Sequence, residues 1–138
     1  MSDIFTKFHV ENLPVDIRPV FHLFTDPEPL DAPAHDHPYD MEIHVLSGGY
    51  IEKNWFQYQG VWHFTNAVRR PGTIHMVYAK HIHQIEELLD GPCLTLMIPK
   101  HGPNDRKSGF WKFEDGKAMF REWDQEEFQP VNNPYEKA

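Results

Sequence analysis

Short runs of alternating apolar and polar residues, separated by turn residues, are the feature that most constrains the fold of this chain. Each run carries β-branched or aromatic residues at every second position, which is the period of a β-strand. The clearest runs are Met41–Leu46, "YIEKNWFQY", "VWHFT", "TIHMVY", "HIHQIEEL" and "CLTLMI". Between them stand turn pairs such as Gly48-Gly49, Gln59-Gly60 and Pro71-Gly72. Many short strands at close spacing predict an all-β sandwich or barrel.

The pair Asp115-Gly116 gives the strongest hairpin signal. The runs "GFWKF" and "KAMFREW" flank it, and Asp-Gly closes tight hairpins because both residues tolerate positive φ. A helical turn is expected near residues 13–17, so the fold should contain at most one or two short helices. The 138 residues fit one domain, with a barrel core at about residues 20–124 and an irregular tail over residues 129–138.

The composition excludes several classes of function. Thirteen Lys and Arg residues against twenty-one Asp and Glu residues give a net charge of −8, which opposes phosphate binding, so we expect no nucleic-acid partner. Cys93 is the single cysteine, so no disulfide can form within the chain, which fits a reducing compartment. No stretch resembles a signal peptide or reaches the length of a membrane span. We therefore expect a cytoplasmic protein without membrane contact.

Two histidines in a short polar loop, His35 and His37, are the first candidate metal ligands. In an extended segment, residues two apart point to the same face, so both imidazoles can reach one point. Glu42 follows at an odd offset, and a bend near Pro38 must correct its facing if it is to join them. If Glu42 points inward, so does His44. Two imidazoles and a carboxylate suit first-row transition metals, whereas the alternative is a solvated loop with Glu42 facing water.

Two segments together resemble the two sequence motifs of the cupin family. The first motif is His-x-His, three or four residues, Glu and a later Gly, and it is matched by His35, His37, Glu42 and Gly48 or Gly49. The second motif runs from Gly through Pro-x-Gly to His and ends in Asn; Gly72 and His83 match its Gly and His, whereas Glu87 stands at the Asn position. The chain departs from the family where Pro29 replaces the opening Gly of the first motif and where Tyr78 and Lys80 replace the Pro and Gly of the second. The resemblance covers roughly residues 33–124.

The resemblance implies a double-stranded β-helix, or jelly-roll barrel, with a divalent transition metal held by His35, His37, Glu42 and His83. Fe(II) is the expected metal, with Mn, Ni or Zn as alternatives. His75 competes with His83 as the fourth ligand, because "PGTIH" also fits the end of the second motif. We favour His83, since Gly72 then opens a strand, and we expect the two histidines on successive strands of one hairpin.

The leading functional hypothesis is a metal-dependent enzyme that acts on a small polar organic molecule, with dioxygenase-type Fe(II)/O2 chemistry. His44 and Tyr78 are candidate proton carriers in the catalytic site. Alternatives are a non-catalytic module that binds a metal or a metabolite, and a metal-free epimerase-like protein that uses a His and Tyr pair. The pair Arg69-Arg70 is either solvated charge or a site for a substrate carboxylate. By analogy with other cupins we expect a homodimer.

Overall fold

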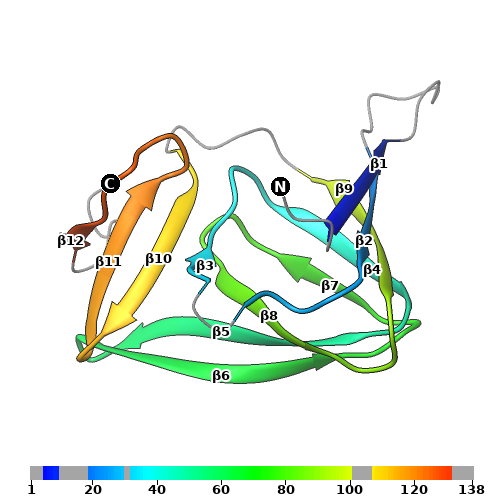
Figure 1. Cartoon of the computed structure of the whole chain (residues 1–138), viewed down its shortest axis with the longest axis horizontal. Helices are drawn as coiled ribbons and strands as arrows, with labels where there is room; N and C mark the ends of the chain where they lie inside the picture. Colours follow the sequence, from blue (N-terminus) through cyan, green and yellow to red (C-terminus); the bar gives the residue numbers. More distant parts are fainter. Residues whose placement is uncertain (1–4, 10–18, 30–31, 101–106, 132–138) are drawn as a thin grey trace.

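The computed structural model describes residues 5–9, 19–29, 32–100 and 107–131. These residues form twelve strands and no helix, which confirms the all-β prediction (Figure 1). The first six strands are β1 (Phe5–His9), β2 (Val20–Phe24), β3 (Ala34–His35), β4 (Met41–Ser47), β5 (Tyr50–Tyr58) and β6 (Val61–Arg69). The others are β7 (Ile74–Val77), β8 (Ile82–Leu88), β9 (Cys93–Pro99), β10 (Gly109–Glu114), β11 (Lys117–Glu122) and β12 (Gln129–Val131). The described part of the chain contains no helix long and apolar enough to cross a bilayer.

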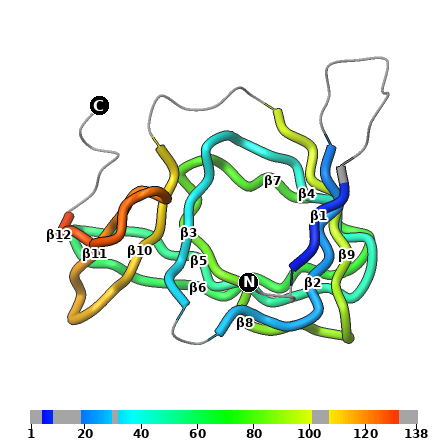
Figure 2. Tube along the Cα trace, turned by 45° about the horizontal axis from the view of Figure 1, so that its top comes forward, coloured from blue at the N-terminus to red at the C-terminus, as the bar shows by residue number. Residues whose placement is uncertain are grey.

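The strands form two antiparallel sheets. One has the order β1-β2-β9-β4-β7 and the other the order β12-β11-β10-β3-β8-β5-β6. Seen along its opening, the molecule is a ring of strands, with β4 and β7 on one side and β3, β5 and β8 on another (Figure 2). The hairpin of β10 and β11 stands beside this ring (Figures 1 and 2). Side chains of both sheets line a cavity inside this ring.

Two tight hairpins form where the turn residues predicted them. Asp115 and Gly116 have φ of 52° and 75° and join β10 to β11, whose ends pair through Glu114 and Lys117. Gln59 and Gly60 have φ of 52° and 77° and join β5 to β6. Positive φ at both central residues gives the turn a twist that matches that of the flanking strands.

Two expectations about the strands are corrected. β7 pairs with β4 in the first sheet, whereas β8 pairs with β3 and β5 in the second, so the strands of His75 and His83 do not form one hairpin. The short link between them crosses from one sheet to the other. The tail expected to be irregular begins with β12, which pairs with β11. The expected helical turn at residues 13–17 and the rest of the tail lie outside the described residues.

Two apolar clusters hold the sheets in place. The first lies inside the ring and joins both sheets; its buried members are Val20, Met41, Ile43, Val45, Tyr50, Val77, Ile85, Cys93 and Met97. The second lies within the curled second sheet, between its β10–β11 hairpin and the outer face of β3, β8, β5 and β6. Its buried members are Ala34, Ile82, Trp111 and Ala118, with Trp55, Trp62 and Phe113 packed against them. Strands β3 and β8 lie between the two clusters, so their alternate residues face different environments.

Candidate metal centre

The pairing of β3 with β8 brings two of the candidate histidines side by side. His35 and His83 are direct partners in the antiparallel register. Their neighbours Ala34 and Ile82 are buried in the second apolar cluster, on the other face of the sheet. Because side chains alternate along a strand, burial of Ala34 and Ile82 on that face directs His35 and His83 into the ring. The two imidazole centroids are 4.7 Å apart.

The residue between the two loop histidines anchors the loop. Asp36 is 5% exposed, and its carboxylate accepts hydrogen bonds from the Gly109 N–H at 2.7 Å and from the Trp111 indole at 3.1 Å. This directs Asp36 toward β10 and leaves His35 and His37 on the opposite side. The backbone N–H of His37 also donates to the carbonyl of Ala79 at 3.1 Å. The His-x-His spacing thus places both imidazoles on one side of the loop, because the central residue, Asp36, faces β10.

His35, His37 and His83 form a cluster that fits a metal ion. Each offers one ring nitrogen, and the three nitrogens lie within 4.8 Å of one another. Nε2 of His37 and Nε2 of His83 are 3.2 Å apart. Two nitrogens at about 2.1 Å from a common ion are separated by roughly 3.0–3.4 Å when the angle at the ion is tetrahedral or octahedral. The spacing and the chemistry of these donors therefore fit a first-row divalent ion, with positions left for other ligands.

A buried carboxylate orients His83. Glu52 on β5 is 0% exposed, and its Oε2 accepts a hydrogen bond from Nδ1 of His83 at 2.8 Å. Its Oε1 accepts two hydrogen bonds from Arg69, at 3.0 and 2.7 Å. Because Nδ1 donates to Glu52, Nε2 of His83 keeps its lone pair toward the other histidines. A carboxylate behind a ligating histidine fixes the ring and its tautomer in this way in metalloproteins.

Hydrogen bonds keep the carboxylate of Glu52 ionised, whereas burial keeps the imidazoles of His35 and His37 neutral. Burial by itself raises the pKa of Glu52, but the hydrogen bonds from His83 and Arg69 outweigh it and lower the pKa of this carboxyl below its usual range. Burial lowers the pKa of His35 to about 3, and burial together with His83 holds the pKa of His37 well below its usual value. Both imidazoles are therefore neutral at pH 7, which is the form that binds metal.

The metal-free protein should lose stability in mild acid. Burial lowers the pKa of His35 to about 3 and those of His75 and His81 to about 4. In the unfolded chain the imidazole pKa is about 6.5, so between these values the unfolded state binds protons that the native state does not bind. Stability is then complete above pH 6.5 and decreases as the pH falls toward 3. Burial raises the pKa of Glu28 to about 7, which acts in the opposite direction, but this is one group against several histidines. Urea unfolding with a chelator present, repeated between pH 7.5 and 4.5, measures the trend, and a midpoint that rises on acidification contradicts it.

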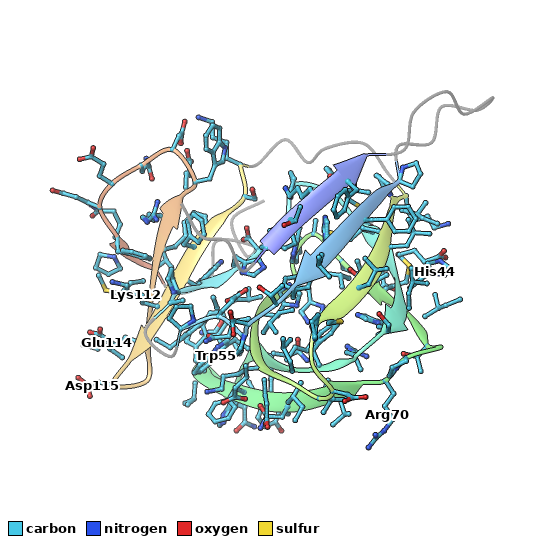
Figure 3. The ribbon with its side chains drawn as sticks, turned by 45° about the vertical axis from the view of Figure 1, so that its right-hand side comes forward. His44, Trp55, Arg70, Lys112, Glu114 and Asp115 are labelled. Carbon is cyan, nitrogen blue, oxygen red and sulfur yellow. The ribbon has the colours of Figure 1, made fainter. Side chains whose placement is uncertain are left out.

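Glu42 and His44 do not join the cluster, contrary to the sequence expectation. The neighbours Met41, Ile43 and Val45 are buried inside the ring, so the strand turns Glu42 and His44 to the outside. There Nε2 of His44 donates to Glu42 at 2.6 Å, and Lys100 lies 3.4 Å from the same carboxylate. The bond from His44, followed by Lys100, lowers the pKa of Glu42. Figure 3 shows His44 projecting from the edge of the ring away from its interior.

Tyr78 and His75 also lie outside the cluster. Tyr78, the other expected proton carrier, is 58% exposed on the link between β7 and β8 and does not line the cavity. His75 pairs across from Ile43 and places its Nε2 3.3 Å from the hydroxyl of Tyr50. Of the two competitors for the fourth ligand, the structure brings His83 to the loop histidines and leaves His75 elsewhere.

Sequence reasoning missed two acidic residues near the cluster. Glu52 lies in an alternating run between Ile51 and Lys53, and nothing local distinguishes it from the glutamates of the other runs. Glu28 lies in the proline-bounded segment before β3, lines the cavity and places Oε1 3.9 Å from Nδ1 of His35. A hydrogen bond from its backbone N–H to the carbonyl of Ile85, at 3.1 Å, attaches this segment to β8. Both acids reach the site through pairings between distant parts of the chain.

A second group of potential ligands shares one histidine with the first. Glu52, His81 and His83 also have donor atoms within 4.8 Å of one another. Glu52 already accepts bonds from Arg69 and His83, and the ring of His81 is hydrogen-bonded to the side chain of Asn54. The first group, in which Nε2 of His37 lies 3.2 Å from Nε2 of His83, is the better fit for a metal ion. Arg69 is thus engaged by a carboxylate of this chain, while Arg70 projects outward (Figure 3).

Known structures share the fold, although sequence comparison finds no relative: no family model matches the chain, and no curated protein matches it significantly. The hydroxypropylphosphonic acid epoxidase from S. wedmorenis is similar with a TM-score of 0.53 at 16% identity, over 71% of this chain and 51% of that one. The DMSP lyase DddQ from Ruegeria pomeroyi DSS-3 is similar with a TM-score of 0.52 at 21% identity, over 77% and 51%. A putative mannose-6-phosphate isomerase from Ralstonia eutropha JMP134 gives 0.52 at 17% identity, over 71% and 85%.

These similarities agree with the two curled antiparallel sheets described above. The chain has the double-stranded β-helix fold of the cupins, as its two motifs predicted. It spans about half the length of the epoxidase and lyase structures. At these identities the likeness establishes the fold, and the function has to be argued from the site.

Proposed function

We propose that this chain is a metal-dependent enzyme that binds a divalent transition metal through His35, His37 and His83 and acts on a small organic molecule that coordinates the metal. The observation that carries the proposal is the convergence of three imidazoles inside a cavity. Three protein ligands leave coordination positions open, as catalytic sites require and structural sites do not.

Fe(II) with O2 is the chemistry that we favour within this proposal. An all-imidazole set suits iron and also admits Mn, Ni, Co or Zn, so donor chemistry alone does not select the metal. Among the structures with this fold, the epoxidase was solved with Fe(II), and also with Co(II) and its substrate. A bound divalent ion of this kind supplies Lewis acidity and, for iron, redox chemistry with O2.

The roles of the protein groups follow from their contacts. His35, His37 and His83 hold the ion, and Glu52 with Arg69 keeps the His83 ring in place. Glu28 lines the cavity beside His35, where a carboxyl group can exchange a proton with a bound molecule. Apolar side chains of the ring line the cavity beside the histidines. None of these roles falls to His44 or Tyr78.

Metal should stabilise the protein measurably. A metal present at a hundredfold excess over Kd adds about 2.7 kcal/mol, or roughly 10 °C in Tm for a domain of this size. Melting of protein treated with a chelator and then supplied anaerobically with Fe(II) measures the shift, and metal analysis gives the stoichiometry. His37→Ala should remove both the shift and the metal. His63→Ala, which changes an exposed histidine stacked on Phe56, is the matched control and should behave as the original chain.

Two results separate the alternatives. Wild-type protein that binds no divalent ion above background would overturn the proposal in favour of a metal-free protein. Stoichiometric metal with no O2 consumption and no turnover across a panel of small hydroxy and oxo acids would favour a binding module instead.

A further inference from the structure

The cavity in front of the histidines has two unlike walls. Its volume is about 630 Å³, which is within the range of sites for small organic ligands. The second sheet contributes the nitrogen donors, because His35 lies on β3 and His83 on β8. The first sheet contributes apolar side chains; those that line the cavity include Phe24, Met41, Ile43, Val77 and Met97. A molecule that coordinates a metal on one wall therefore extends toward hydrocarbon on the other.

Aromatic side chains extend the apolar wall toward the first strands. Phe24 stacks on Phe5 with ring centroids 4.7 Å apart and lies 6.5 Å from the ring of Tyr50. Phe5, on β1 of the first sheet, and Tyr50, on β5 of the second sheet, also line the cavity. Such rings bury large apolar areas when a ligand packs against them. A wholly polar ligand would leave this surface uncovered and would lose its own hydration without compensation.

The charges around the site favour an anionic head on the ligand. Three neutral imidazoles do not cancel the charge of a divalent ion. The negative charge of Glu52 is balanced by Arg69, to which it is bonded directly. Among the described residues, Glu28 is the one carboxylate that lines the cavity, and Lys7 is the one lysine or arginine that does so. A metal-loaded cavity is therefore net positive.

From these observations we infer that the ligand of this site is an amphiphilic acid, with an anionic metal-chelating head at the three histidines and an aliphatic or aromatic body of several carbons against the first sheet. The inference rests on the proposed metal site and narrows its ligand class. It adds an apolar body to the small polar molecule expected from the sequence, because most side chains of the facing wall are hydrocarbon.

A chain-length series on the Co(II)-loaded protein tests this inference without relying on turnover. The probes are straight-chain 2-hydroxy acids from glycolic acid to 2-hydroxyoctanoic acid, together with the amide of each, and the readout is the Co(II) absorption spectrum and calorimetric Kd. Each methylene that enters the apolar wall should tighten binding by about threefold to fourfold. The uncharged amides should bind much more weakly than the acids at every length.

Variants locate the effect in the cavity. Phe24→Ala should weaken binding of 2-hydroxyoctanoic acid by about tenfold and leave glycolic acid and Co(II) affinity unchanged. Phe64→Ala removes a half-exposed ring on β6 that does not line the cavity, and it should change nothing. If Phe24→Ala fails to fold, the series on the unmodified protein still decides the question.

The outcomes are distinguishable. An affinity independent of chain length, or equal for acids and amides, overturns the inference while metal binding, and with it the proposed site, stands. Absence of stoichiometric Co(II) binding by the unmodified protein overturns the proposed site and this inference together.

Discussion

His83→Ala should abolish tight metal binding while the barrel remains folded. His83 contributes one of three nitrogen donors, and its Nε2 lies 3.2 Å from that of His37. Changes in residues that only support a ligand typically cost about 10–100-fold in metal affinity, so removal of a ligand should cost more than that. Metal content after dialysis, measured on the folded fraction, gives the answer.

His75→Ala is the matched comparison. His75 is half-buried, and its Nε2 contacts the hydroxyl of Tyr50 instead of the cluster. Its loss should leave metal content at the wild-type level. Because the two histidines lie on strands of different sheets, their variants report on separate parts of the barrel, and a circular dichroism spectrum of each is needed as a folding control. Retained metal in His83→Ala, or selective loss in His75→Ala, would reject the cluster.

Glu52→Ala should produce the largest loss of stability of any single change considered for this site. The carboxylate is fully buried and accepts bonds from both His83 and Arg69, and its removal leaves Arg69 uncompensated. Breaking a buried ion pair in this way costs about 3–5 kcal/mol, and we expect the lower end because the side chain of Arg69 is 23% exposed and reaches water. Metal affinity should also fall by about 10–100-fold, because the ring of His83 is no longer held.

Glu86→Ala provides the control for that change. Glu86, on the neighbouring strand β8, forms an ion pair with Lys53 at 3.5 Å, but both side chains are partly exposed. Such a pair is worth under about 1 kcal/mol, so its loss should have little effect. Urea unfolding of both variants at pH 7 compares them. Equal losses in the free energy of unfolding would show that Glu52 contributes no more than a surface ion pair, which would contradict its role as a buried partner of His83 and Arg69.

The strands and turns could be predicted because their causes are local. Period-two alternation directs one set of side chains inward whatever the rest of the chain does, and Asp115-Gly116 closes a hairpin because both residues accept positive φ. The same local logic applies to His35 and His37, which are two residues apart on either side of Asp36. The motif at His83 added a long-range expectation that the structure matches in placing that histidine beside the pair.

The carboxylate could not be predicted in the same way. In β4 the motif favoured Glu42, but burial of Met41, Ile43 and Val45 directs these three side chains inward and Glu42 outward. The apolar alternation of β4 was visible in the sequence. It indicated that Glu42 faces outward, whereas the motif indicated that it faces inward.

The sequence by itself determined that this chain forms short antiparallel strands with tight turns and that two histidines project together from one loop, because alternation and turn conformation are set by neighbouring residues. The tertiary structure alone decided which acid serves the site. Glu52 is one of several glutamates in alternating runs, and only the pairing of β5 with β8 and β6 brings it between His83 and Arg69. That choice depends on which strands lie side by side, and burial of two separate apolar clusters, rather than any local pattern, sets that arrangement.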